Sequence, residues 1–91
     1  MEYIIDYTDE AVADLIRLRD SEPKAYAKVQ QLISELIEHP KTGTGKPEQL
    51  KGKRSGQWSR YITKKHRLIY TINDTEVLVL VLSSYGHYDD K

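Results

Sequence analysis

The sequence contains no cysteine. This absence excludes disulfide frameworks, cysteine-ligated zinc sites and thiol nucleophiles together. Nothing in the composition marks the chain as secreted, so we expect it to act inside the cell, in the cytoplasm.

Long apolar runs are also missing. No stretch approaches the roughly 20 apolar residues that a membrane-spanning helix needs. The first ten residues, MEYIIDYTDE, do not have the basic start and apolar stretch of an export signal. We therefore expect no membrane partner. With 38% hydrophobic and 31% charged residues, the 91-residue chain is predicted to form one domain over 1–91 with a single core.

Net charge is absent too, because 14 basic residues balance 14 acidic ones. A neutral chain is a poor candidate for binding nucleic acid when its charges are mixed, but here they are segregated. Residues 41–67 carry nine basic side chains and one carboxylate, Glu48, whereas acidic residues predominate on both sides of this segment. The basic segment is where an anionic partner is expected to bind.

The spacing of apolar residues predicts an α+β fold with the order β-α-α-β-β-β. A helical hairpin is expected to cover one face of a small, mostly antiparallel sheet, which leaves the other face for solvent, a partner or a substrate. The segment over 41–56 is expected to be an exposed loop or a short irregular edge segment. The expected elements are a strand over 2–7, helices over 9–20 and from 21–23 to about 37, and strands over 58–63, 67–72 and 76–83.

The apolar positions also predict the core. The first helix is expected to bury Val12 and Leu15, with Ala11 and Leu18 beside them. The run VLVLVL at 77–82 is apolar on both faces, so its strand should lie inside the sheet. Trp58, Arg60 and Ile62 share one face of their strand. Trp58 is a core anchor if that face is buried and a base-stacking residue if it is open, and the sequence leaves both readings standing.

Three kinds of side chain in the C-terminal half could act together on RNA. Cleavage without a metal needs a base for the 2′-hydroxyl proton, an acid for the leaving 5′-oxygen, and cations for the charge that develops at phosphorus. Glu48 suits the base, since neighbouring cations favour its charged form. His87 suits the acid, because the unperturbed pKa of histidine lies near neutrality. Arg60 and Arg67 supply positive charge.

Structural roles compete with these assignments. A single glutamate in a basic loop commonly pairs with a lysine, and a histidine near a terminus is commonly solvated. Arg67 could form a cross-strand ion pair. His66 faces the other side of the strand from Arg67, and we interpret it as structural.

Two other chemistries are not favoured. GTGKPE is only superficially similar to a phosphate-binding loop, because Pro47 stands where such a loop needs another residue type. The His, Asp and Glu residues are too scattered to predict a metal cage, so we expect neither a metal nor a cofactor.

The second half of the chain resembles the YoeB/Txe family of toxins in the RelE superfamily. The resemblance rests on Lys46-Pro47-Glu48, Leu50-Lys51, Gly56, Trp58-Ser59-Arg60, Ile62, His66-Arg67-Leu68-Ile69-Tyr70 and His87-Tyr88. The first half agrees in its strand-helix-helix pattern. The resemblance implies a RelE-like fold, similar to that of microbial ribonucleases.

The resemblance also implies an activity and a set of roles. It implies a bacterial, ribosome-dependent endonuclease that cuts mRNA in the A site and is held inactive by a cognate antitoxin. The family's base aligns with Glu48, its phosphate-stabilising arginine with Arg67, its acid with His87 and its positioning tyrosine with Tyr88. Lys51 and Arg60 match family positions that contact phosphate, and the other cations of the basic segment are expected to bind RNA: Lys53, Arg54, Lys64 and Lys65.

The chain departs from the family pattern at two positions. A second arginine often follows the Trp-Ser-Arg step, where this chain has Tyr61, and a basic residue often lies two positions before the terminal histidine, where it has Tyr85. The alternative to the enzyme is a non-catalytic module that binds RNA or the ribosome through the same cations. Relatives form homodimers, and nothing in the sequence specifies one here.

Overall fold

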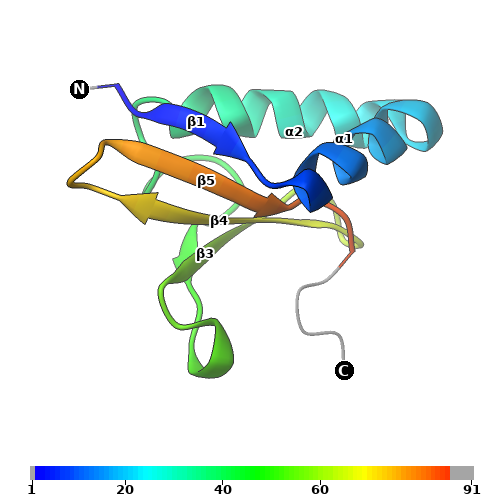
Figure 1. The fold of residues 1–91 in the computed structure, drawn as a ribbon. Coiled ribbons are helices and arrows are strands. Elements are labelled where there is room, and N and C mark those ends of the chain that lie inside the picture. The colour runs from blue at the N-terminus through cyan, green and yellow to red at the C-terminus, as the bar shows by residue number, and fades with distance from the viewer. Residues whose placement is uncertain (1, 87–91) are drawn as a thin grey trace.

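Two helices pack on one face of a five-stranded sheet, as Figure 1 shows. The computed structural model describes residues 2–86. The elements are β1 (Ile4–Tyr7), α1 (Asp9–Ser21), α2 (Pro23–Leu36), β2 (Glu48–Gln49), the 3₁₀ turn η1 (Gly52–Arg54), β3 (Gln57–Tyr61), β4 (Arg67–Asn73) and β5 (Leu78–Ser83). The α+β prediction, with a helical hairpin on a mostly antiparallel sheet, is confirmed.

The strand order is β1-β5-β4-β3-β2. The strands β2 to β5 pair antiparallel, and β1 runs parallel to β5, with Ile4 opposite Leu78. The run VLVLVL thus lies inside the sheet, as expected. The short edge strand β2 lies within the segment that was expected to be a loop or an irregular edge.

The ends of the helices follow from local chemistry. The Thr8 hydroxyl accepts a hydrogen bond from the Ala11 N–H at 3.0 Å, and this caps α1. Asp9 in the first turn complements the positive end of the helix. Pro23 begins α2, where its missing N–H costs nothing.

The core lies between the helices and the sheet. Ala11, Leu18 and Leu32 from the helices meet Leu68 and Tyr70 from β4, and all five are buried. The prediction for Val12 is wrong, because this side chain is 45% exposed. The buried stripe of α1 runs through positions 11 and 18, and Val12 lies about 100° around the helix from Ala11.

The turn between β4 and β5 is longer than predicted. Asn73 Oδ1 accepts from the Glu76 N–H at 3.0 Å, and Val77 takes a left-handed conformation with φ of 55°. A β-branched residue rarely adopts this conformation, so the sequence did not indicate that β5 begins only at Leu78.

Residues that alternate with the core side chains line the opposite face of the sheet. On β4 these are Arg67, Ile69 and Thr71; on β3 they are Gln57, Ser59 and Tyr61, which lie opposite the same three residues in the pairing. Neither helix covers this face (Figure 1). We call it the open face.

Candidate active site

Glu48 lies on the open face, at the edge strand β2. It pairs with Ser59, which in turn pairs with Ile69 in β4. Directly opposed residues point to the same side of an antiparallel sheet. The Glu48 side chain is exposed, and it makes no hydrogen bond or ion pair within residues 2–86. Its carboxylate is therefore available to a ligand on this face.

Arg67 lies on the same face as Glu48, at the start of β4. Its guanidinium carbon is 3.7 Å from the centre of the Tyr61 ring, and its Nη1 donates to the Thr63 carbonyl at 3.2 Å. No carboxylate among the described residues pairs with Arg67, so the expected alternative of a cross-strand ion pair is not observed there.

The pairing register gives the separation between these two charges. Glu48 is two strands away from β4 and two residues along from Arg67. With usual strand spacings this amounts to about 10 Å across the sheet and about 7 Å along it between Cα atoms. The long side chains of Glu48 and Arg67 can therefore reach the same small group of a substrate.

A surface hollow lies beside Tyr61. Gly45, Lys46 and Tyr61 line it. The Tyr61 N–H donates to the Gly45 carbonyl at 2.7 Å, which fixes the segment before β2 against the end of β3. Only glycine fits at position 45, because φ is 85° and a Cβ atom would lie 2.8 Å from the Tyr61 carbonyl oxygen.

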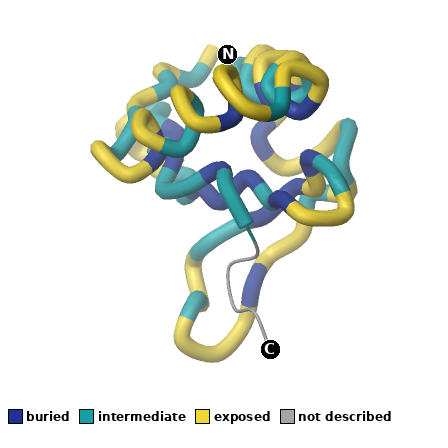
Figure 2. The backbone as a smooth tube through the Cα atoms, turned by 90° about the vertical axis from the view of Figure 1, so that its right-hand side faces the viewer, coloured by how far each residue is buried: buried dark blue, intermediate teal, exposed yellow. Residues whose placement is uncertain are grey.

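The remaining cations form two groups at opposite ends of β3. Lys51, Lys53 and Arg54 lie in the loop that projects away from the helices, which is largely exposed in Figure 2. Lys64 and Lys65 are exposed in the turn between β3 and β4. Positively charged side chains therefore lie on both sides of Glu48 and Arg67.

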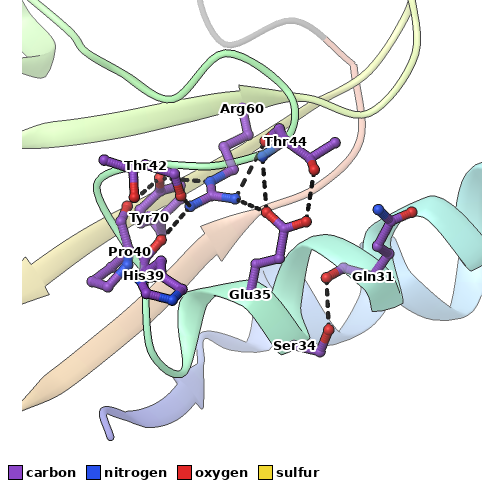
Figure 3. A network of polar contacts seen from close by, with 9 residues as sticks. All are labelled: Gln31, Ser34, Glu35, His39, Pro40, Thr42, Thr44, Arg60 and Tyr70. Atoms are coloured by element: carbon purple, nitrogen blue, oxygen red, sulfur yellow. Dashed lines mark hydrogen bonds and ion pairs between the residues drawn. The ribbon is translucent and has the colours of Figure 1, made fainter. Parts of the chain in front are cut away.

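Arg60 does not belong to this surface, and its predicted phosphate contact is wrong. The residue has no exposed area and lies on the helix face of β3 (Figure 3). Its guanidinium nitrogens donate to five acceptors: Glu35 Oε1 at 2.8 Å, the Tyr70 hydroxyl at 3.2 Å, and the carbonyl oxygens of His39, Thr42 and Thr44. An arginine has five N–H donors, so none remains for RNA.

Burial of Arg60 also answers the question about Trp58. Because both side chains lie on the helix face, Trp58 packs against the core as an anchor. Tyr61, on the other face, is the aromatic residue of β3 that is exposed to a ligand, at 40%.

Glu35 is a residue that sequence reasoning missed. It accepts from the Thr44 hydroxyl at 2.7 Å and the Thr44 N–H at 2.9 Å, in addition to Arg60. These hydrogen bonds, those from Thr44 first, lower the pKa of the Glu35 carboxyl below its usual value. The network ties α2 to the segment that leads into β2. A lone acidic residue on the apolar side of a predicted helix was the available signal.

His87 and Tyr88 lie outside the described residues. The described chain ends at Gly86, whose carbonyl accepts from the Arg67 N–H at 3.0 Å. The segment that leads to His87 is therefore attached to the strand that carries Arg67.

No cluster of three His, Cys, Asp or Glu residues within residues 2–86 could hold a metal ion. No helix in this range is long and apolar enough to cross a membrane.

Comparisons with known proteins show the family to which the chain belongs. The family model for the YoeB-like toxin of bacterial type II toxin–antitoxin systems matches residues 7–88. Toxin YoeB of Streptomyces coelicolor is 39% identical over 84 residues, which are 92% of this chain and 98% of that protein. Toxin YoeB of Escherichia coli K12 is 36% identical over 73 residues, which are 80% and 87% of the two chains.

Solved structures share the fold. The YoeB/ParE toxin from Agrobacterium tumefaciens superposes with a TM-score of 0.87 at 30% identity, covering 93% of this chain and 99% of the other. The toxin in a YoeB–YefM complex from Staphylococcus aureus gives 0.81 at 29% identity, covering 97% and 100%. Fold and relatives together define a toxin of a bacterial type II toxin–antitoxin system. The chain belongs to the YoeB-like toxin family.

Proposed function

We propose that this toxin is a ribosome-dependent endoribonuclease that cleaves mRNA in the ribosomal A site without a metal ion. The observation that carries the proposal is the placement of Glu48 and Arg67 on the sheet face that neither helix covers, between two groups of cations. A base and a cation on one face supply two of the three requirements for this reaction.

The proposed chemistry is an internal transfer at phosphorus. Glu48 takes the proton of the 2′-hydroxyl, and the 2′-oxygen forms a bond to phosphorus while the bond to the 5′-oxygen breaks. Arg67 stabilises the charge on the non-bridging oxygens. His87 donates a proton to the leaving 5′-oxygen, and Tyr88 positions the substrate; both roles rest on the family resemblance. The products are a 2′,3′-cyclic phosphate and a 5′-hydroxyl.

RNA binding is assigned to the two groups of cations at the ends of β3. Lys51, Lys53 and Arg54 would hold phosphates on one side of Glu48, and Lys64 and Lys65 would do so near Arg67. A domain of this size presents few positioning contacts, so the ribosome is proposed to align the mRNA. The toxin would then act in the bacterial cytoplasm, where translation occurs.

An antitoxin is the proposed protein partner. A relative from Staphylococcus aureus has been solved as a YoeB–YefM complex, and another structure from that organism is a YoeB dimer. An acidic antitoxin segment would match the basic loop of residues 51–56. Reversing the charges of Lys51, Lys53 and Arg54 should weaken the complex, and unchanged affinity would exclude this electrostatic contribution.

The decisive test maps cut sites on translated mRNA. Wild-type toxin should cut within the A-site codon, and Glu48→Gln should slow the cut by about 10²–10⁴. A 2′-deoxy nucleotide at the cut site should block the reaction. Glu38→Gln, a change of an exposed carboxylate on the helix side, is the matched control and should cut normally.

The RNA ends identify the mechanism. Cyclic phosphate and 5′-hydroxyl ends are expected, whereas 5′-phosphate ends or cutting of the deoxy substrate would contradict the proposal. Ribosome binding by the wild type with no cleavage at any concentration would favour the alternative of a non-catalytic binding module.

A further inference from the structure

Each of the last three described residues contacts another part of the chain. The Ser84 N–H donates to Asp14 Oδ2 at 3.0 Å. The Tyr85 ring lies 4.3 Å from the His66 ring, and the guanidinium carbon of Arg17 lies 3.9 Å from the Tyr85 ring centre. Gly86 makes hydrogen bonds with both its N–H and its carbonyl. We call Ser84, Tyr85 and Gly86 the C-terminal anchor.

Gly86 is fixed by two consecutive residues. Its N–H donates to His66 Nδ1 at 2.8 Å, and its carbonyl accepts from the Arg67 N–H at 3.0 Å. The position of Gly86 along β4 is therefore set by the same short segment that presents Arg67 to the open face. His87 is the next residue in the sequence.

The Gly86 contact requires one protonation state of His66. A backbone N–H can only donate, so Nδ1 must be an acceptor and carry no proton. The proton of the neutral ring is then on Nε2, which lies 2.8 Å from Glu22 Oε2 and donates to it. The ring is 2% exposed, and its hydrogen bond lowers the pKa of the Glu22 carboxyl. Glu22 thus orients His66 with Nδ1 toward Gly86.

We propose that His66, oriented by Glu22, is a positioning residue that holds Gly86, the residue before His87 in the sequence, against the strand that carries Arg67. The catalytic part of this inference rests on the proposed function. The contact itself does not, since it joins described residues only.

Two substitutions separate the two hydrogen bonds of His66. Asparagine carries its side-chain oxygen close to the place of Nδ1, so His66→Asn retains an acceptor for Gly86 and loses the donor to Glu22. Glutamine carries its amide nitrogen close to the place of Nε2, so His66→Gln retains the donor and loses the acceptor. Both remove the ring that packs on Tyr85, which makes them a matched pair.

The first measurement is hydrogen exchange of the Gly86 amide by NMR. Wild type and His66→Asn should protect this amide, and His66→Gln should not.

The second measurement is cleavage of ribosome-bound mRNA. His66→Gln should lower kcat by about 10- to 100-fold with KM little changed, since a misplacement of about 1 Å can cost about 10²-fold. His66→Asn should recover most of this loss. The exposed His39 gives the control pair, and His39→Asn and His39→Gln should both cut like the wild type.

Each result has a definite meaning, provided that thermal unfolding shows all variants folded at the assay temperature. Equal loss of kcat in both His66 variants overturns the positioning role, and a protected Gly86 amide in His66→Gln overturns the contact. If the wild type does not cut RNA, the proposed function fails, while the amide measurements still decide whether His66 holds Gly86.

Discussion

The guanidinium of Arg67 lies on the ring of Tyr61, 3.7 Å from the ring centre, across the β3–β4 pair. The two residues are directly opposed in the register, so the Tyr61 ring stacks against the Arg67 guanidinium. The family pattern often has an arginine where this chain has Tyr61. In this chain Tyr61 takes the place of that second arginine, and its ring orients Arg67.

Loss of this ring should therefore weaken catalysis without affecting the fold. A partly exposed cation–π contact contributes about 0.5–1 kcal/mol, so Tyr61→Ala should slow cleavage by about two- to fivefold, and Tyr61→Phe should cut normally. Single-turnover cleavage by the two variants is the measurement. A loss in Tyr61→Phe equal to that in Tyr61→Ala would assign the effect to the hydroxyl instead.

Arg60 should matter for stability and not for RNA binding. Arg60→Met leaves the Glu35 carboxylate and several carbonyl oxygens without donors, and removing one member of such a buried pair costs about 3–5 kcal/mol. Arg60→Lys should cost less, because lysine supplies three of the five donors. Denaturant unfolding measures both losses. A fully stable Arg60→Met protein with weakened RNA affinity would restore the phosphate contact predicted from sequence.

Glu35 should make stability depend on pH in the acid range. Its folded-state pKa lies below its ordinary value of 4.5, so its charged form stabilises the fold above that pH. The contribution is lost as the pH falls through the lowered pKa. Glu35→Gln should lose about 1–3 kcal/mol at pH 7, and the difference from the wild type should shrink below about pH 4. Unfolding free energies at several pH values test this; a constant difference would contradict it.

Lys53 should contribute to RNA affinity through charge alone. It is exposed in the basic loop, and each phosphate contact to a single strand contributes about 0.7 to the slope of log K against log salt. In a Glu48→Gln background, in which cutting is slowed, Lys53→Gln should reduce the slope by about that amount. Lys24→Gln, on the exposed side of α2, is the control and should leave the slope unchanged.

The alternation of side chains along the strands predicted more of the fold than the amino-acid composition did. It placed His66 and Arg67 on opposite sides of the chain and His66 in a structural role, and the His66 side chain is indeed buried. It also placed Arg60 on one face with Trp58 and Ile62, without deciding whether that face was the core. The apolar character of that face was not enough to predict a buried arginine, because burial depends on Glu35 and on carbonyl groups from a distant loop.

The parts that could not be predicted depend on tertiary contacts. Val77 adopts a left-handed turn that its side chain disfavours, and β2 has two residues, too few for any periodicity. Glu22 and Asp14 received no role from the sequence, yet each forms a hydrogen bond with a residue more than forty positions away, Glu22 with His66 and Asp14 with Ser84. No local pattern carries such information.

The parallel pairing of β1 with β5 has a consequence for how the toxin is made. Ile4 and Leu78 lie opposite each other although most of the domain separates them in the sequence. During translation β1 must remain without its partner strand until β5 has been made, and pairing at such long separation is slow. A fragment that stops before β5 cannot complete this sheet, so the domain acquires its native fold only after its last strand has been made.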